Sequence, residues 1–321
     1  MDIKRPIDRF DALVIGGGPA GLSAAIYLAR ARRSVAVFEC GRPGRSDWKQ
    51  LNYNYLGFPD GISAVELAER GRRQAERYGA RFVETEVATL ARVEDGFEVS
   101  SPAGEFHGRG VVLATGVDDR WVEFPGYEEY IGRTMHWCIV CDGYEMEGQR
   151  VVVVGNDEHA AELAIQMLDY RSREVSLVTN CGALGLTPGA VQRLHDREVR
   201  LLVGRIAGAR AREAGTFEAL LFEGGGELEL DHLFSSQGAV PNTELARSIG
   251  VALNEHGYIK VDTEAHTSVP GVYAAGDVTR LFAHQVVTAA HEGATAATAL
   301  NYRLYRQDQE AFVAETTSPD G

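Results

Sequence analysis

The pattern of apolar and polar residues places two similar strand–turn–helix–strand units along the chain. In the first, DALVIGGGPAGLSAAIYLARARRSVAVFE, a strand ending at Val14 and Ile15 is followed by a glycine-rich turn, an alanine-rich helix and a strand that ends at Glu39. The second, RVVVVGNDEHAAELAIQMLDYRSREVSLVTN, begins at Arg150. Alternating strands and helices predict an α/β fold with parallel sheets, and the repeat predicts two Rossmann-like three-layer domains.

Further segments extend the predicted architecture. GRGVVLATG predicts a strand that leads into residues 114–116. GVYAAGDVTRLFAHQVVTAAHEGATAATALNYRLYRQ predicts a strand, a turn at Gly276 and Asp277, and a long alanine-rich helix that starts near His284.

Composition and charge narrow the class of protein. The 321 residues are enough for two domains, 45% of them are hydrophobic, and the net charge of -14 argues against nucleic-acid binding. No uncharged apolar run approaches the ~20 residues of a membrane span. The N-terminal stretch lacks the apolar segment and cleavage site of a signal peptide. We therefore expect a cytoplasmic protein that binds neither nucleic acid nor membrane.

The first glycine-rich turn has the spacing of a dinucleotide-binding fingerprint. Gly16, Gly18 and Gly21 form G-x-G-x-x-G directly after a strand and at the start of a helix. Such glycines allow a tight turn, approach of the backbone to a pyrophosphate, and close packing of helix on strand, while Glu39 is placed to bind a ribose hydroxyl. The strand, the helix and Glu39 all stand at the spacing that this fingerprint requires, which favours a dinucleotide site over an empty glycine-rich turn.

The segment HWCIVCDGYE carries a second candidate site, since Cys138 and Cys141 stand two residues apart and Asp142 follows. Three interpretations compete: a redox dithiol, two buried structural cysteines, or half of a zinc site completed by His136 and Cys181. Structural zinc commonly uses two paired cysteine knuckles, and the chain has one, so we expect no metal. The adjoining aspartate and the predicted dinucleotide site favour the redox dithiol.

The spacing of the two cysteines suits reversible disulfide chemistry. Disulfide exchange proceeds by thiolate attack, and the leaving thiolate needs a proton. Asp142, next to Cys141, can supply that proton as a general acid if it is protonated at neutral pH. His136 either tunes the thiolate fraction or is held by backbone contacts.

The order of these motifs resembles the low-molecular-weight thioredoxin reductases over nearly the whole chain. The CxxCDG and AAGDV stretches are its specific parts. The resemblance implies an FAD-binding domain made of 1–118 and 242–321, an inserted NAD(P)-like domain of 119–241 that carries the CxxC, and a homodimer. It also implies that Cys141 faces the flavin and that Cys138 attacks the disulfide of thioredoxin.

The resemblance further implies a set of FAD contacts. An asparagine in NYNYLGFP matches a flavin-contacting residue of the family, whereas an arginine usually stands where this chain has His284. A helix N-terminus beside the flavin would stabilise negative charge on its reduced form. The implied contacts are Gly16, Gly18, Pro19, Ala20, Gly21, Glu39, Asn54, Ala114, Thr115, Gly116, Gly276, Asp277, His284, Gln285 and Val286.

The second Rossmann-like unit departs from the family pattern where NADPH binds. Asp157 stands where a glycine lets the pyrophosphate approach, and Glu158 follows it, so two carboxylates repel the ligand. The next strand ends at residues 179–181, TNC, in place of the arginines that hold a 2′-phosphate, and it offers no acid for NADH. We predict loss of nicotinamide binding; the alternative is an unusual nucleotide pose on other loops.

An intact dithiol without its usual donor site resembles the ferredoxin-dependent branch of the family. Plant-type ferredoxins have reduction potentials of about -400 mV and thioredoxin has one of about -270 mV. Transfer of two electrons from ferredoxin to thioredoxin therefore releases roughly 6 kcal/mol. The expected activity is FAD-dependent reduction of thioredoxin with ferredoxin as donor. One alternative is a flavin-dependent dithiol oxidase that reduces oxygen, which Asp142 disfavours because that branch usually has histidine there. The other is a redox sensor without turnover.

An acidic reductase needs a local basic patch to attract an acidic ferredoxin. LAERGRRQAERYG predicts a helix with several arginines, and the alternative for them is an ordinary solvated helix face. A second cluster lies near the end of the first predicted helix. The candidates are Arg70, Arg72, Arg73 and Arg77 in the first cluster and Arg30, Arg32 and Arg33 in the second.

Overall fold

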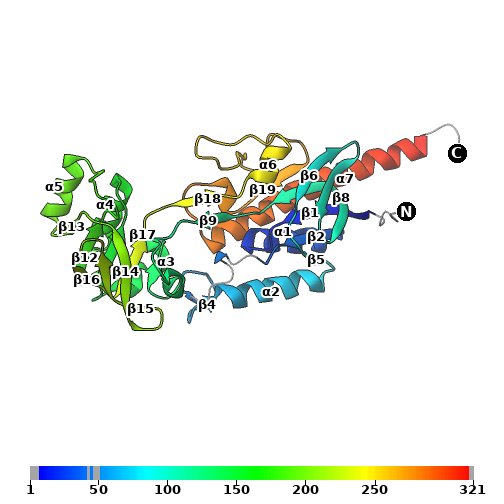
Figure 1. Cartoon of the computed structure of the whole chain (residues 1–321). Helices are drawn as coiled ribbons and strands as arrows, with labels where there is room; N and C mark the ends of the chain where they lie inside the picture. The colour runs from blue at the N-terminus through cyan, green and yellow to red at the C-terminus, as the bar shows by residue number, and fades with distance from the viewer. Residues whose placement is uncertain (1–6, 42–43, 46–50, 318–321) are drawn as a thin grey trace. The chain divides into compact units, whose positions relative to one another are not determined.

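The computed structural model describes residues 7–41, 44–45 and 51–317, which divide into two compact units (Figure 1). Unit 1 contains the described parts of 1–51, 55–118 and 240–321, and unit 2 contains 52–54 and 119–239. Each of the two chain segments that connect the units contains a short strand. These strands, β9 (Val117–Asp119) and β18 (Ala239–Pro241), pair with each other.

The core of unit 1 is a seven-stranded sheet of order β5-β2-β1-β8-β7-β6, with β19 also paired to β8. Strands β5, β2, β1, β8 and β19 run parallel, and β6 and β7 continue the sheet antiparallel. Alternate residues of β1 belong to two hydrophobic clusters, because successive side chains point to opposite faces. The strands are β1 (Asp8–Ile15), β2 (Val35–Glu39), β5 (Arg81–Glu84), β6 (Thr89–Val93), β7 (Gly96–Ser101), β8 (Gly104–Leu113) and β19 (Val272–Ala274).

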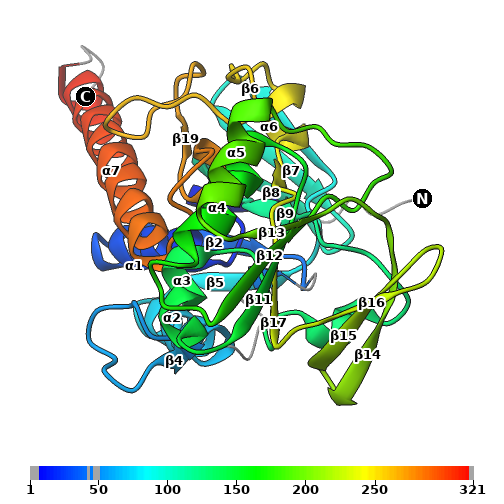
Figure 2. The same ribbon diagram turned by 90° about the vertical axis from the view of Figure 1, so that its left-hand side faces the viewer.

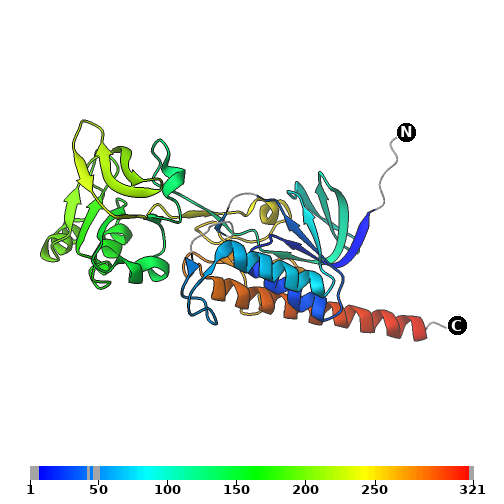
Figure 3. The same ribbon diagram turned by 90° about the horizontal axis from the view of Figure 1, so that it is seen from below.

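Helices cover one face of this sheet, where α1 lies between α2 and α7 (Figure 3). Helix α1 (Pro19–Arg30) buries its alanine-rich side, and α7 (Val286–Thr317) packs along it. A Cβ atom on Gly293 of α7 would lie 2.0 Å from the carbonyl oxygen of Ala20, so only glycine allows this approach. Helix α2 (Ala64–Arg77) begins at Ser63, whose side chain accepts a hydrogen bond from the N–H of Glu66.

Unit 2 is built on a five-stranded parallel sheet of order β10-β17-β11-β12-β13. Helices α4 and α5 contact one face, and a three-stranded antiparallel sheet shares a hydrophobic cluster with the other (Figure 2). In β11, Val151 and Val153 belong to the helix-side cluster and Val152 and Val154 to the opposite one. The prediction of an α/β fold with parallel sheets and two Rossmann-like units is confirmed.

The remaining elements are short or belong to unit 2. None of the helices in the described part of the chain is long and apolar enough to cross a membrane. The elements are β3 (Leu51–Asn52), β4 (Ile62–Ser63), η2 (Tyr127–Tyr130), β10 (Met135–His136), α3 (Ile139–Asp142), η3 (Gly143–Met146), β11 (Arg150–Val154), α4 (Glu158–Gln166), β12 (Glu174–Val178), α5 (Pro188–Asp196), β13 (Arg200–Leu202), β14 (Ile206–Glu213), β15 (Thr216–Phe222), β16 (Glu227–Glu229), β17 (His232–Ser235), α6 (Glu244–Ser248) and η4 (Asp277–Thr279).

Candidate active site

Cys138 and Cys141 are joined by a disulfide at the start of α3. Their Cα atoms lie 5.3 Å apart, within the range that a disulfide spans. The carbonyl of Cys138 accepts hydrogen bonds from the backbone N–H groups of Cys141 at 3.2 Å and Asp142 at 3.1 Å. This turn holds both sulfur-bearing side chains together. A disulfide leaves neither sulfur as a thiolate for zinc, so the geometry favours the redox interpretation.

Asp142 is buried next to the disulfide, with only 8% of its surface exposed. The glycine that follows it is required by packing, because a Cβ atom on Gly143 would lie 2.9 Å from the ring of Tyr170. The CDG sequence therefore fixes the backbone on both sides of the acid. The carboxyl group is held in the same short helix as Cys141, where a proton donor for disulfide exchange is needed.

His136 is buried on β10, and its ring makes its contacts with side chains. Its Nε2 lies 3.0 Å from Nδ1 of His232, and its Nδ1 lies 3.5 Å from Oδ1 of Asp142. The alternative of a histidine held by backbone contacts is therefore not what the structure shows. His232 was not a candidate from the sequence, because nothing near it marks a site.

The glycine fingerprint of unit 1 forms a turn that larger residues could not enter. A Cβ atom on Gly16 would lie 2.1 Å from the carbonyl oxygen of Ala114, and one on Gly21 would lie 1.8 Å from the carbonyl oxygen of Gly16. Gly18 begins α1 and provides no side-chain cap. The first N–H groups of α1 are thus directed at a position that suits a pyrophosphate.

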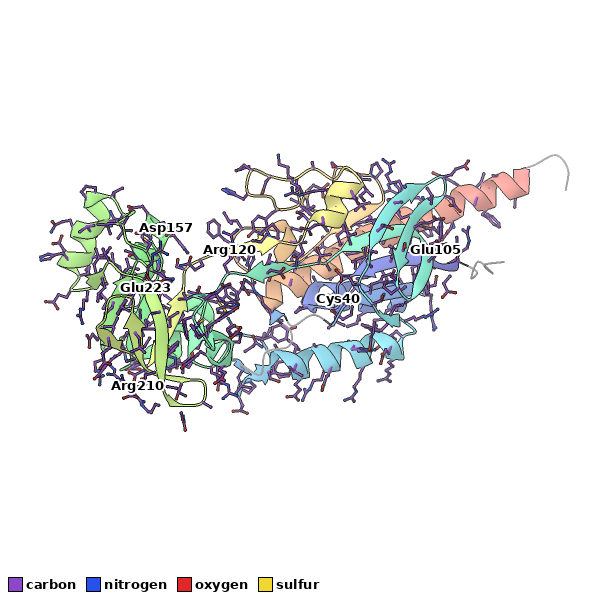
Figure 4. The ribbon with its side chains drawn as sticks, viewed as in Figure 1. Cys40, Glu105, Arg120, Asp157, Arg210 and Glu223 are labelled. Carbon is purple, nitrogen blue, oxygen red and sulfur yellow. A yellow bond between two sulfur atoms is a disulfide. The ribbon has the colours of Figure 1, made fainter. Side chains whose placement is uncertain are left out.

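Glu39 ends β2 and contacts the same turn. Its Oε2 accepts a hydrogen bond of 2.6 Å from the N–H of Gly17, and a Cβ atom on Gly17 would lie 2.4 Å from that oxygen. Cys40, which follows, is exposed (Figure 4). A carboxylate at a strand end beside a helix N-terminus is the arrangement that binds a ribose and a pyrophosphate, so these residues fit a dinucleotide such as FAD.

The Gly276–Asp277 turn lies at the start of α1 and is held by a residue that sequence reasoning missed. Glu292 of α7 accepts a hydrogen bond of 2.8 Å from the N–H of Gly276. A Cβ atom on Gly276 would lie 2.9 Å from the side chain of Ala20, and Asp277 pairs with Arg45 at 2.6 Å. The turn and the fingerprint are therefore adjacent within unit 1, although they are more than 250 residues apart in sequence.

Other predicted FAD contacts of unit 1 also lie at ends of strands or helices. Thr115 donates to the carbonyl of Asn242 at 2.6 Å, and the carbonyl of Gly116 accepts from the N–H of Asn242 at 3.0 Å. His284 Nε2 lies 2.7 Å from the carbonyl oxygen of Arg280. Pro19 is the first residue of α1, and Gln285 and Val286 stand at the start of α7.

Asn54 is the predicted FAD contact that lies outside unit 1. Its segment, residues 52–54, belongs to unit 2. The side-chain amide donates to the carbonyl of Val140 at 3.3 Å, so Asn54 contacts α3, the short helix that carries Cys141.

The nucleotide turn of unit 2 is occupied by a side chain of the protein itself. Asp157 caps α4, and its Oδ1 accepts a hydrogen bond of 2.9 Å from the N–H of Ala160 (Figure 4). The N-terminus of this helix is where a Rossmann unit binds a pyrophosphate. The Asp157 carboxylate therefore occupies an N–H group that a nucleotide would need. It also repels the negative charge of the pyrophosphate.

The loop that follows β12 is tied across the same turn. Asn156 Oδ1 accepts from the N–H of Gly185 at 2.8 Å. Glu158 accepts from the N–H and the hydroxyl of Thr187 at 3.0 and 2.8 Å, and it pairs with Arg193 at 3.0 Å. The hydrogen bonds from Thr187 hold the pKa of Glu158 below its usual value. Glu158 thus remains ionised and ties the loop that follows β12 to the N-terminus of α4.

Several of the arginines considered for a basic patch are neutralised by acids. Arg70 pairs with Glu66 at 2.6 Å, and Arg72 pairs with Glu76 at 3.0 Å. Arg33 is largely buried in an ion pair of 2.6 Å with Asp308 of α7. These pairs support the interpretation of α2 as a solvated helix face.

These features define a class of protein: a flavin-dependent disulfide oxidoreductase with a CxxC disulfide. The family model described as pyridine nucleotide-disulphide oxidoreductase matches residues 10–295. The thioredoxin reductase of Treponema pallidum is 31% identical over 294 residues, which cover 90% of this chain and 95% of that protein. The chain thus belongs to the pyridine nucleotide-disulphide oxidoreductases and, within them, to the low-molecular-weight thioredoxin reductase family, whose cofactor is FAD.

Two further comparisons agree with this assignment. The crystal structure of thioredoxin reductase from Streptococcus pyogenes superposes with a TM-score of 0.86 and 28% identity, covering 94% of this chain and 100% of that one. "NADPH-dependent thioredoxin reductase 3" of Arabidopsis thaliana is 34% identical over 89% of this chain, but the chain spans only 57% of that protein.

Proposed function

We propose that this protein is an FAD-dependent thioredoxin-disulfide reductase that takes its electrons from reduced ferredoxin rather than from NADPH. In this proposal, FAD binds a domain made of 1–118 and 242–321 and supplies electrons to the disulfide of an inserted domain, 119–241. The name of the plant relative includes NADPH, and the donor is where we propose that this chain differs.

The observation that carries the choice of donor is the cap on α4. Asp157 accepts the hydrogen bond from Ala160, and Glu158 fastens the following loop through Thr187. A nucleotide would have to displace both contacts and accept two nearby negative charges. Ferredoxin needs no such pocket, because a protein donor delivers electrons from its own cluster.

The chain's own residues divide the disulfide chemistry among them. In the proposal, the Cys138 thiolate attacks the disulfide of thioredoxin and forms a mixed disulfide, and Cys141 then attacks Cys138 and releases the product. Asp142 gives a proton to the leaving thiolate, which makes it a better leaving group. The buried position of Asp142 in the same helix as Cys141 supports this role.

The partners and the location are part of the same proposal. Thioredoxin is the substrate named in the relatives, and we extend it to this chain together with a homodimer and a cytoplasmic location. Size-exclusion chromatography with light scattering tests the dimer, which predicts twice the chain mass of 34.9 kDa.

The donor is tested by a half-reaction without thioredoxin. The oxidised protein, yellow with bound FAD, is mixed anaerobically with NADPH, NADH or reduced ferredoxin, and flavin absorbance is followed. Reduced ferredoxin should bleach the flavin, and both nicotinamides should leave it unchanged at physiological concentrations. Rapid stoichiometric bleaching by NADPH would refute the proposed donor, while colourless protein that takes up no FAD would refute the whole scheme.

A further inference from the structure

The glycine fingerprint at the end of β1 lies between two other features of the candidate FAD site. The sheet order is β2-β1-β8, and β19 also pairs with β8, so β2 and β19 lie on opposite sides of β1. Glu39 ends β2, whereas the Gly276–Asp277 turn follows β19. These strands run parallel, so their carboxyl ends share one edge of the sheet. The acid and the turn therefore lie on opposite sides of the fingerprint.

This topology assigns the two halves of a bound dinucleotide to the two sides. An acid at the end of the second strand binds the ribose of the adenosine half, and the pyrophosphate lies at the N-terminus of the first helix. The flavin half of FAD then extends away from Glu39, towards Gly276. The turn lies beside that helix N-terminus, because a Cβ atom on Gly276 would be 2.9 Å from the side chain of Ala20. We therefore expect the turn to contact the flavin half.

A largely buried carboxylate of α7 holds both ends of this turn. The side chain of Glu292 is only 13% exposed. Its Oε2 accepts a hydrogen bond of 2.8 Å from the N–H of Gly276, where η4 begins, and its Oε1 pairs with Arg280, where η4 ends. Within the turn, the hydroxyl of Thr279 donates to the carbonyl of Gly276 at 2.9 Å. One side chain thus ties both ends of η4 to α7.

The backbone of the turn explains why it needs an external anchor. Gly276 has a φ of 81° and a ψ of -161°, a conformation that essentially only glycine adopts. Glycine is also the residue with the greatest conformational freedom, so contacts from outside the turn are needed to fix it. A carboxylate suits this task, because its hydrogen bond to a backbone N–H is charge-assisted. Arg280 balances the charge that Glu292 buries.

The same part of α7 is also packed directly against α1. A Cβ atom on Gly293 would lie 2.0 Å from the carbonyl oxygen of Ala20, so the two helix backbones are in contact there. The hydroxyl of Ser23 donates to the carbonyl of Ala290 at 2.7 Å. Since Glu292 stands between these two contacts, α7 sets the distance between the start of α1 and the turn.

We propose that Glu292 is a positioning residue for the flavin half of FAD. It holds the Gly276–Asp277 turn at the distance from α1 that the flavin half requires, whereas the adenosine half depends on Glu39 and the fingerprint. The inference concerns the cofactor alone, so it goes beyond the proposed function and does not depend on which donor supplies the electrons.

The experiment compares FAD with ADP, which matches the adenosine half of FAD together with its pyrophosphate. Holoprotein is ultrafiltered at a series of dilutions, and the FAD in the filtrate gives the Kd for FAD. Displacement of FAD by added ADP gives a Ki for the adenosine side alone. Glu292→Gln keeps an oxygen for the N–H of Gly276 but loses the charge, and Glu292→Leu loses both. The matched control is Asp308→Asn, because Asp308 also lies on α7 and pairs at 2.6 Å with Arg33, whose side chain is 14% exposed.

The two constants separate positioning from a general loss of stability. Glu292→Gln should raise the Kd for FAD about tenfold, because a charge-assisted hydrogen bond becomes a neutral one and the pair with Arg280 is lost. Glu292→Leu should raise it further. Neither change should alter the Ki for ADP by more than about twofold, because Glu39 and the fingerprint hold the adenosine half. Asp308→Asn should lower the urea midpoint but leave both constants at their wild-type values.

Three results would overturn the role of Glu292. An equal rise in both constants in the Glu292 variants would show that this residue supports the fold of unit 1 as a whole. A rise in the Kd for FAD of the same size in Asp308→Asn would show the same of α7. An unchanged Kd for FAD in Glu292→Leu would show that the turn binds FAD without this anchor. Failure of ferredoxin as a donor leaves the test intact, whereas a wild-type protein that binds no FAD would refute the proposed function itself.

Discussion

Replacing Asp157 with glycine should partly reopen the nucleotide site of unit 2. The Asp157 carboxylate accepts the N–H of Ala160, so a phosphate taking the same N–H would lie within about 5 Å of it. At that distance two unit charges repel by about 0.8 kcal/mol in water-like surroundings and about 3 kcal/mol at the effective dielectric constant of a protein surface. Asp157 is exposed, so the lower figure applies.

The size of the effect follows from the charge of the ligand. Removing the carboxylate makes the binding free energy of a pyrophosphate with two charges more favourable by about 1.6 kcal/mol, which raises its affinity roughly fifteenfold. The fold should tolerate the change, because glycine replaces a good helix cap at a cost of only a few tenths of a kcal/mol. Binding remains weak, since the Glu158–Thr187 contacts still hold the loop.

The assay is the apparent second-order rate of anaerobic flavin reduction by NADPH, which can be measured even when binding does not saturate. Asp157→Gly should raise this rate about tenfold. Asp157→Asn should raise it less, because asparagine removes the charge but still caps the helix. Asp169→Asn removes an equal charge at an exposed residue elsewhere in unit 2 and serves as the control. If Asp157→Gly raises the rate of flavin reduction no more than Asp169→Asn does, the Asp157 carboxylate is not what prevents reduction by NADPH.

Three further predictions concern the disulfide, the FAD turn and pH. Cys138→Ser should leave Cys141 as a thiolate beside the flavin and give long-wavelength absorbance, whereas the same band in Cys141→Ser alone would reverse the two roles. Gly21→Ala should lose FAD, measured by absorbance after gel filtration, because the added Cβ would lie 1.8 Å from the carbonyl oxygen of Gly16; full FAD occupancy would contradict the proposed turn. His232 has a pKa of about 4 when folded and 6.5 when unfolded, so its unfolded form binds more protons between these values. Stability should therefore fall by about 3 kcal/mol as pH drops through this window, and His232→Gln should flatten the slope of urea midpoints against pH.

The two Rossmann-like units were predictable because their signals are local. A glycine turn that follows an apolar strand and precedes an alanine-rich helix specifies strand, turn and helix within one stretch of about 30 residues. The CxxCDG stretch is equally local, since Cys138, Cys141 and Asp142 all fall in one short helix and its cap. Local patterns of this kind carry both spacing and chemistry.

Features that depend on pairing between distant segments were not predictable. His232 reaches His136 only through the pairing of β10 with β17, and Glu292 reaches Gly276 only because α7 packs beside that turn. The arginines of α2 are visible in the sequence, but their neutralisation depends on side-chain geometry that spacing only suggests. The negative charge of Asp157 predicted repulsion of a pyrophosphate from the sequence alone. Its role as the N-cap of α4 became visible only in the structure.

The most direct test of the account is turnover with ferredoxin as the only electron source. Catalytic amounts of the protein are incubated anaerobically with reduced ferredoxin and excess oxidised thioredoxin, without nicotinamide, and thiols are counted as ferredoxin is oxidised. The account predicts two ferredoxins oxidised for each thioredoxin disulfide reduced, and no thiols with Cys138→Ser. It is contradicted if reduced ferredoxin yields no thioredoxin thiols while oxygen and a small dithiol give rapid peroxide formation, the behaviour of an oxidase.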